Sequence, residues 1–134
     1  MRNIQFRGKK KDNGEWVYGY YSPVYLPIFD NQVDFINEGG YRAIEIDENT
    51  VGQSTGLNDK NGVEIYEKDI VETNIYYANL RVKGICEFRD GSFGVVWKRG
   101  DVETFTPFSA FANSEFEVIG NIFDNPELLE GDKR

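Results

Sequence analysis

Apolar and polar residues alternate with a period of two along much of the chain, whereas the helical period of about 3.6 residues is almost absent. The alternation is clearest between Leu80 and Ile122. Because successive side chains of a strand point to opposite faces, this pattern predicts strands that bury one face. The strands predicted for this half of the chain lie at residues 69–73, 80–88, 93–98, 102–106 and 116–122.

Short turns join these strands. Asp90-Gly91 is a pair that favours a tight hairpin, and a second turn is predicted at residues 98–101. Strands joined in this way form an antiparallel meander, which curls onto itself when no helices cover its buried face. We therefore expect an all-β protein in which residues 57–134 form an SH3-like small barrel. The predicted interior of this barrel includes Leu80, Val82, Phe88, Val95 and Val118.

The two ends of the chain carry further signals. Residues 1–56 are predicted to form an N-terminal β subdomain, a β-hairpin layer packed on the barrel. Its first element is a hairpin over residues 2–21 with a basic tip, because Asn13-Gly14 tolerates the positive φ of a tight turn. At the other end, residues 125–131 read Asn-Pro-Glu-Leu-Leu-Glu-Gly, which predicts one short C-terminal helix with an N-cap and a terminating glycine.

Between these ends the pattern is harder to interpret. Pro23 and Pro27 lack backbone donors, which predicts an edge strand or an extended connection for residues 22–29. A short strand is predicted at residues 33–36. The segment 51–62 is dense in turn formers, and we expect two successive tight turns there.

Composition supports a folded chain but removes most catalytic chemistry. The 134 residues are 40% hydrophobic and 15% aromatic, which excludes a disordered protein. With no histidine and one cysteine, the chain has no Ser-His-Asp triad, no Cys-His pair and no plausible zinc site. A lone thiol forms no internal disulfide, no signal peptide is expected at the N-terminus, and no apolar run approaches the roughly 18 residues of a membrane span. We expect a cytoplasmic protein that needs no cofactor and does not contact membranes.

The net charge of −8 is unevenly distributed. Bases concentrate in residues 1–12 and 80–100, whereas carboxylates concentrate in residues 44–72. An acidic protein repels phosphate backbones on average. A nucleic-acid-binding protein that uses the basic hairpin 2–21 and the strands at 80–100 is nevertheless kept as the first alternative function.

Three acidic or glycine-rich patterns resemble ligand sites, and each has a simpler structural interpretation. The segment 51–62 lacks the lysine and the following helix of a phosphate loop. Asp59 begins a segment that misses the spacing of a calcium loop and predicts an Asx turn before a strand. A second alternative function is a metal-dependent enzyme that uses Glu64, Glu67 and Asp69 around Mg²⁺. The simpler interpretation is a solvated acidic turn before a strand that begins at Asp69.

Aromatic and basic side chains lie close together in sequence near the start of strand 80–88 and the end of strand 93–98. On one face of a barrel, such side chains stack on bases or on a proline-rich peptide. The candidate binding surface consists of Tyr76, Tyr77, Arg81, Lys83 and Arg99. The simpler interpretation places Trp97 in the core and the two tyrosines in a loop.

Three stretches resemble the YopX family of small phage and prophage proteins. They are Ile4-Gln5-Phe6-Arg7-Gly8-Lys9 with Gly14-Glu15-Trp16-Val17-Tyr18-Gly19, the segment Val51–Val71, and the segment Phe116–Leu129. The resemblance covers both ends and the middle of the chain. It implies an all-β fold with an SH3-like barrel in the C-terminal half and a phage-encoded origin, and it brings no activity and no functional residues.

Two positions depart from the family pattern, which has an aromatic residue where Ser54 stands and a glycine where Lys68 stands. A lysine at 68 predicts that a positive φ is not required there, or that the local backbone differs. We therefore expect a non-catalytic accessory protein with no metal site, most simply a protein-binding or self-associating β module. Its expected partner is a host or phage protein in the bacterial cytoplasm, or a second copy of itself.

Overall fold

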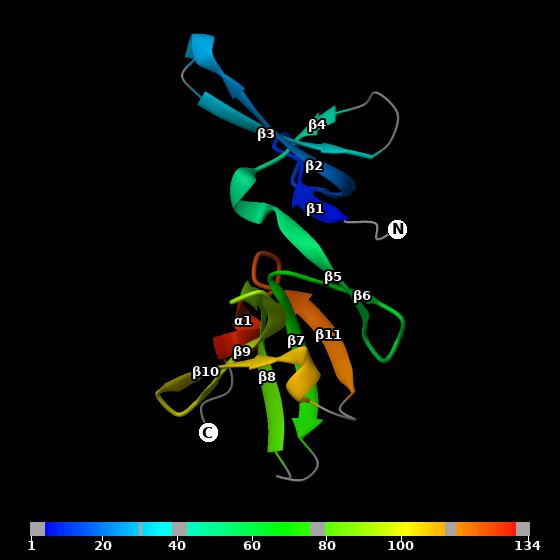
Figure 1. The fold of residues 1–134 in the computed structure, drawn as a ribbon, viewed down its shortest axis with the longest axis vertical. Coiled ribbons are helices and arrows are strands. Elements are labelled where there is room, and N and C mark those ends of the chain that lie inside the picture. Colours follow the sequence, from blue (N-terminus) through cyan, green and yellow to red (C-terminus); the bar gives the residue numbers. More distant parts are fainter. Residues whose placement is uncertain (1–4, 30, 39–42, 76–79, 112–114, 131–134) are drawn as a thin grey trace. The chain divides into compact units, whose positions relative to one another are not determined.

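The alternating pattern produces strands along nearly the whole chain. The computed structural model describes residues 5–29, 31–38, 43–75, 80–111 and 115–130, which form an all-β protein with one short helix (Figure 1). The chain divides into two compact units, Met1–Ser54 and Thr55–Arg134, and each unit is described by itself. The boundary expected from the sequence falls after residue 56.

Unit 1 is built on the predicted N-terminal hairpin. Strand β1 (Phe6–Lys9) pairs antiparallel with β2 (Trp16–Leu26), and Gly14 in the connecting turn has a φ of +75°. Strand β3 (Asn31–Asn37) pairs with β2, and β4 (Ala43–Glu45) pairs with β3. The predicted hairpin is therefore confirmed. The short strand predicted at residues 33–36 is also present, as part of the longer strand β3.

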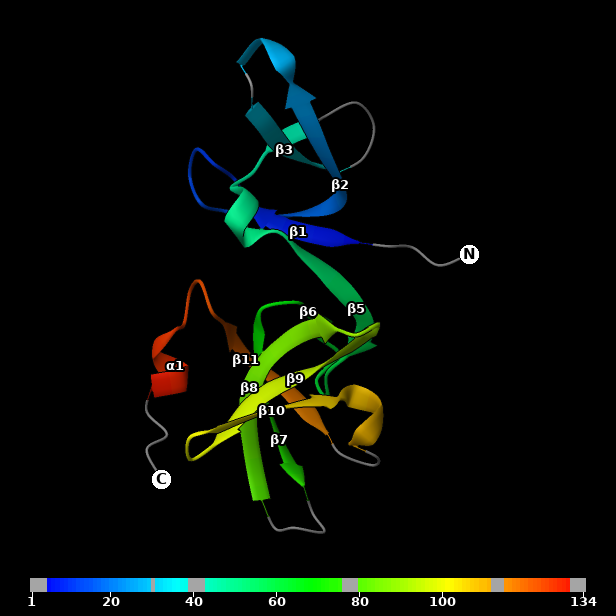
Figure 2. The ribbon, with the colours of Figure 1, turned by 60° about the vertical axis from the view of Figure 1, so that its left-hand side comes forward.

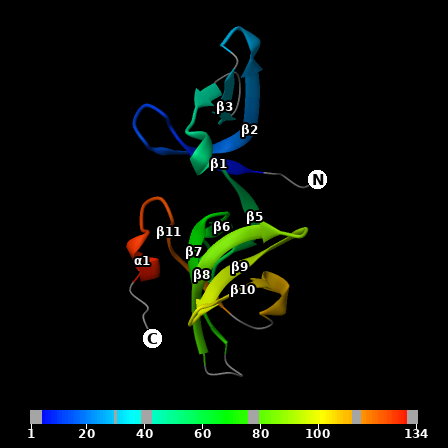
Figure 3. The same ribbon diagram turned by 90° about the vertical axis from the view of Figure 1, so that its left-hand side faces the viewer.

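The proline-containing segment continues β2 and does not break it. Residues 20–26 of β2 pair with β3 alone, and the two strands lie side by side in Figure 3. Within this stretch, Pro23 lies opposite Asp34. A proline is tolerated here because the pairing of β2 with β1 ends at Gly19, so its missing N–H belongs to no ladder with β1. The prediction of an edge strand or an extended connection for residues 22–29 is therefore confirmed for residues 22–26, which pair on one side only, whereas Pro27–Phe29 form a 3-10 helix.

The core of unit 1 is small and closed by backbone contacts. Val17, Ile36 and Ile46 are buried at its centre, with Phe6 and Tyr21 packed against them. Lys10 forms an isolated antiparallel bridge with Ile46, and the Lys11 N–H donates to the Glu45 carbonyl at 3.1 Å. The outer edge of β4 is thus covered by the chain that follows β1.

The glycine-rich segment forms a strand over residues 52–58, where the first of two turns was predicted, and the predicted second turn lies at residues 60–62. Strand β5 (Gly52–Asn58) places Gln53 opposite Phe6 of β1 and is followed by β6 (Glu64–Tyr66). Ser54 and Thr55 are buried, and the Thr55 hydroxyl donates to the Ile65 carbonyl at 2.8 Å. Small side chains with satisfied hydroxyls fit this position, so pairing with neighbouring strands overrides the local turn preference.

The sheet of unit 2 contains five antiparallel strands in the order β10-β9-β8-β7-β11 (Figure 2). The strands are β7 (Asp69–Ile75), β8 (Leu80–Arg89), β9 (Ser92–Arg99), β10 (Val102–Pro107) and β11 (Phe116–Asn121). The last strand, β11, pairs with β7 and not with β10, and in this pairing Val118 lies opposite Val71. The simple meander is therefore wrong in its last step, and closure into an SH3-like barrel is not found among the described strands. The predicted short helix is confirmed as α1 (Glu127–Glu130).

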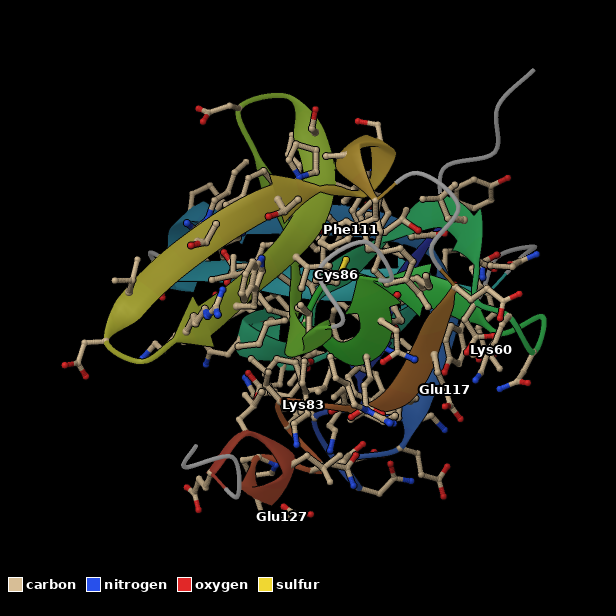
Figure 4. All side chains as sticks on the ribbon, turned by 90° about the horizontal axis from the view of Figure 1, so that it is seen from below. Lys60, Lys83, Cys86, Phe111, Glu117 and Glu127 are labelled. Atoms are coloured by element: carbon tan, nitrogen blue, oxygen red, sulfur yellow. The ribbon has the colours of Figure 1, made fainter. Side chains whose placement is uncertain are left out.

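One face of this sheet holds the core of unit 2. The buried cluster consists of Ile65, Val71, Val82, Cys86, Val95 and Phe111, and Trp97, Phe108, Phe116 and Val118 pack against it. Cys86 and Phe111 of this cluster are labelled in Figure 4. Val82 and Val95 thus lie inside as predicted. Phe88 does not, since 51% of it is exposed and its ring contacts Phe93 near the hairpin turn. The side chain of Leu80 lies outside the described part of the structure.

Lys68 occupies the turn before β7 with a φ of +74°, so the expectation that no positive φ is needed there is wrong. Its N–H donates to the Cys86 carbonyl at 2.8 Å and its carbonyl accepts from the Ile122 N–H at 3.0 Å, which fixes this conformation. The left-handed region costs a residue with a Cβ roughly 1 kcal/mol.

Lys68→Gly is therefore expected to raise the free energy of unfolding of unit 2 by about 1 kcal/mol, because glycine adopts a positive φ without strain. Lys68→Ala is the control, since it removes the charge and keeps the strain. Urea unfolding curves of the three proteins measure the effect. An alanine variant as stable as the glycine variant would assign the gain to charge and contradict the backbone explanation.

Candidate functional site

The structure separates the residues of the predicted binding surface. Tyr76 and Tyr77 lie outside the described residues. Arg81 and Lys83 occupy alternate positions of β8 on the face opposite the buried Val82. Arg99 follows Trp97 by two residues on β9, which places it on the other face of the sheet. The three described cations therefore do not share one surface.

Carboxylates accompany the cations on the Arg81 face. Arg81 donates a short hydrogen bond to Glu72 of β7, which also lies opposite Lys83. The hydrogen bond from Arg81 is the main reason that the pKa of Glu72 is lowered, and the charges of Arg81 and Lys83 lower it further. On β11, next to β7, Glu117 pairs with Lys60 at 3.6 Å (Figure 4). This face is a ladder of compensated charges and not a basic groove.

The same compensation extends to the hairpin between β8 and β9. Arg89 contacts Glu87 at 3.1 Å and Glu103 of β10 at 3.9 Å, and its guanidinium lies 5.8 Å from the centroid of the Phe105 ring. Its positive charge is therefore shared between two carboxylates and an aromatic face.

The basic hairpin of unit 1 is also engaged internally. The guanidinium of Arg7 lies 4.5 Å from the centroid of the Trp16 ring, and the ammonium of Lys9 lies 5.3 Å from it. At the tip, Lys10 pairs with Glu15 at 3.8 Å and Lys11 with Glu45 at 3.3 Å. A cation held on an aromatic ring or beside a carboxylate has less of its field directed to an incoming phosphate.

Asp59 is a structural carboxylate in the predicted Asx turn, which is confirmed. Its Oδ1 accepts from the N–H groups of Asn61 and Val63, each at 2.8 Å, and its Oδ2 accepts from the Val118 N–H at 2.9 Å. Burial alone would raise the pKa of Asp59, but the three backbone donors together lower it below its usual value. The loop after β5 is thereby fastened to β11.

Asp69 also supports the backbone. It is 2% exposed, and its Oδ2 accepts from the Tyr66 N–H at 2.8 Å, which closes the turn between β6 and β7. Its side chain is thus used to hold the backbone of this turn. Among the described residues, no group of three or more acidic, cysteine or histidine side chains is placed to hold a metal ion.

A polar cavity of about 250 Å³ lies in unit 1 beside β3 and β4. Buried Asp34 lines it and accepts from the Tyr21 hydroxyl at 3.0 Å and from Gln32 Nε2 at 2.9 Å. Burial, followed by the hydrogen bond and charge of Asp34, raises the pKa of Tyr21 to about 12. Asp47, another lining residue, caps the following turn by accepting from the Asn49 N–H. These groups serve the fold of unit 1.

A set of exposed apolar side chains lies on β2 and in the turn that follows it. Four of the eight large hydrophobic residues with high exposure in the described chain lie between positions 18 and 28. We call Tyr18, Tyr20, Val24 and Ile28 the β2 strip; they are 45%, 63%, 38% and 84% exposed. Tyr18, Tyr20 and Val24 all occupy even-numbered positions of β2, so they share one face of that strand.

Sequence reasoning missed the β2 strip. Alternation predicted an aromatic strand that ended at Tyr21, and the prolines suggested that the regular face stopped there. The signal that could have extended it is Val24, which continues the even-numbered series that starts at Trp16.

Within the described ranges, no helix has the length and apolarity needed to cross a membrane.

Comparison with known proteins identifies similar chains without a described activity. Residues 5–130 match the sequence profile of a family described as YopX protein. A crystal structure of protein EF1440 from Enterococcus faecalis is similar, with 30% sequence identity and a TM-score of 0.53 over 96% of this chain and 99% of that chain. No curated protein matches the chain.

Proposed function

The chain belongs to the YopX protein family, and from that premise we propose that it is a non-catalytic accessory protein of a phage or prophage that binds another protein in the bacterial cytoplasm. The β2 strip carries this proposal. Solvent-exposed apolar side chains that gather on one short stretch of a small protein mark interaction sites more often than isolated ones do. The compensated charges elsewhere favour a partner that is recognised through apolar contact.

The proposal includes an SH3-like description of unit 2, in which the sheet is a partly open barrel around its buried cluster. The pairing of the first strand, β7, with the last, β11, and the single apolar interior support it. In this description unit 2 is a stable support, and unit 1 presents the contact surface.

A test places a photoreactive benzophenone amino acid at Tyr20 and irradiates cells that produce the protein. We expect one discrete crosslinked product, which mass spectrometry identifies as a bacterial protein, a phage protein or a second copy of the chain. Ile28→Asp should weaken that contact by about tenfold or more, because a charge replaces an apolar anchor. The matched control puts the same photoreactive residue at Val63, which is 49% exposed in unit 2. Equal crosslinking from both positions, or no effect of Ile28→Asp, would contradict the proposal.

Nucleic-acid binding is the alternative that the two basic segments of the sequence kept open. Because the described cations of the hairpin and of residues 80–100 largely contact carboxylates or aromatic rings, we expect no binding of single-stranded DNA or RNA at micromolar protein. Fluorescence anisotropy in about 50 mM salt measures this. A complex that weakens steeply as salt rises would replace protein binding as the proposed function.

A further inference from the structure

Strand β10 is the edge of the unit 2 sheet, and the two edges of that sheet differ. The far edge, β11, is covered by the loop after β5: Val118 donates to Asp59, and the Lys60 N–H donates to the Phe116 carbonyl at 2.9 Å. Among the described residues, no strand pairs with the outer side of β10. An uncovered edge presents backbone donors and acceptors to another strand.

The register identifies which groups of β10 face outward. Arg99 and Val102 flank the two-residue turn between β9 and β10, so they form a hydrogen-bonded pair, and such pairs alternate with non-bonded ones along an antiparallel ladder. Glu103 and Phe105 therefore direct their N–H and carbonyl groups away from β9. Pro107, which has no N–H, falls in the same outward series.

We propose that a second copy of the chain pairs antiparallel along β10, with the two-fold axis at Thr104. Glu103 of each copy then lies opposite Phe105 of the other, and each of these residues donates one backbone hydrogen bond and accepts one. The arrangement is isologous, as the two-fold symmetry of a homodimer requires.

Charge complementarity favours a second copy as the occupant. Opposite residues of a strand pair point to the same face, so the Glu103 carboxylate of the second copy reaches the Phe105 ring, next to which Arg89 already lies. Arg89 lies 3.1 Å from Glu87 and 3.9 Å from Glu103 of its own chain, and the pairing adds the Glu103 carboxylate of the second copy. The axis at Thr104 also keeps the two Glu103 side chains from lying opposite each other. This contact is separate from the β2 strip.

The contact is small, so we expect a weak dimer with a dissociation constant on the order of 100 µM. Hydrogen exchange of the unmodified chain tests the geometry directly. The Glu103 and Phe105 amides should become protected as protein concentration rises through this range, whereas the Thr104 and Thr106 amides should stay protected throughout. Concentration-independent exchange at Glu103 and Phe105 would overturn the proposal.

A charge exchange provides the second test, read by sedimentation velocity. Glu103→Arg should weaken self-association by about tenfold, because it places the new cation beside Arg89 of the other copy. The double variant Arg89→Glu with Glu103→Arg should restore it, and Val63→Asp, which adds a charge at an exposed position outside β10 and the β2 strip, should leave it unchanged. Failure of the double variant to restore association while its thermal unfolding matches the unmodified chain would overturn the pairing. So would a dimer that Ile28→Asp abolishes.

Discussion

Replacing Asp59 with alanine is expected to lower the free energy of unfolding of unit 2 by about 3 kcal/mol. The side chain is 7% exposed and accepts from the backbone N–H groups of Asn61, Val63 and Val118. Alanine leaves these donors without their acceptor, and removal of a charged acceptor costs more than that of a neutral one. The loop after β5, which covers the β11 edge, should also be held less firmly.

Urea unfolding followed by Trp97 fluorescence, in a Trp16→Phe background, reports on unit 2. Asp101→Ala is the control, because Asp101 is an exposed acid in the turn between β9 and β10. The loss of stability for Asp59→Asn should lie between those of Asp59→Ala and Asp101→Ala. Asparagine keeps one acceptor oxygen, but it loses the charge and replaces the other oxygen with an NH₂ group. A loss for Asp59→Ala no greater than that for Asp101→Ala would show that the carboxylate does not fasten the loop.

The same carboxylate gives unit 2 an acid-sensitive component of stability. The pKa of Asp59 is lowered in the folded protein from its ordinary value of 3.8, so its stabilising contribution is complete above that value. The contribution is lost as pH falls below about 4 and through the folded pKa, because the protonated group no longer accepts as a charge. In Asp59→Asn this part of the pH dependence should be absent.

Gly84→Ala is expected to destabilise unit 2 by about 3 kcal/mol or more, or to prevent its folding. Gly84 lies in β8, between β7 and β9. A Cβ there would overlap the Val96 carbonyl oxygen and would lie 2.6 Å from Val95 Cγ1 and 3.0 Å from Trp97 Cβ. Backbone on a central strand cannot move aside without breaking the ladder.

Gly62→Ala is the matched control, since it makes the same change in the same unit at a site with nothing within 4 Å of the added Cβ. Its φ of +83° leaves only the conformational cost of roughly 1 kcal/mol. Urea unfolding of both variants, with circular dichroism to verify that they fold, separates the two effects. Equal losses would show that steric contact at Gly84 is relieved elsewhere.

The sequence predicted elements whose signal is local and repeated. Alternation between Leu80 and Ile122 located β8 to β11, and Asp90-Gly91 has the positive φ values of its predicted turn. Topology was less accessible, because alternation defines the faces of a strand but not its neighbour, and the last strand joined β7. Phe88 follows the inward pattern, yet it lies at the end of a hairpin beyond the reach of the core.

The missed features depend on contacts between distant residues. Gly52–Asn58 consists largely of turn formers and becomes a strand because β1 provides a partner for it. The candidate binding surface grouped Arg81, Lys83 and Arg99 by sequence proximity, whereas strand parity puts Arg99 on the other face and Glu72 binds Arg81. The packing of the N-terminal layer on unit 2, the metal-dependent alternative, the cytoplasmic location and the identity of the partner stay predictions.

The lone cysteine of this chain gives unit 2 a built-in reporter of its own opening. Cys86 has no exposed surface and is surrounded by the aliphatic and aromatic side chains of the core. An alkylating reagent can therefore modify it only when that core separates, and Met1–Ser54 contributes no competing thiol. The rate of native-state alkylation, followed by mass spectrometry, thus measures how often unit 2 opens without any engineered label.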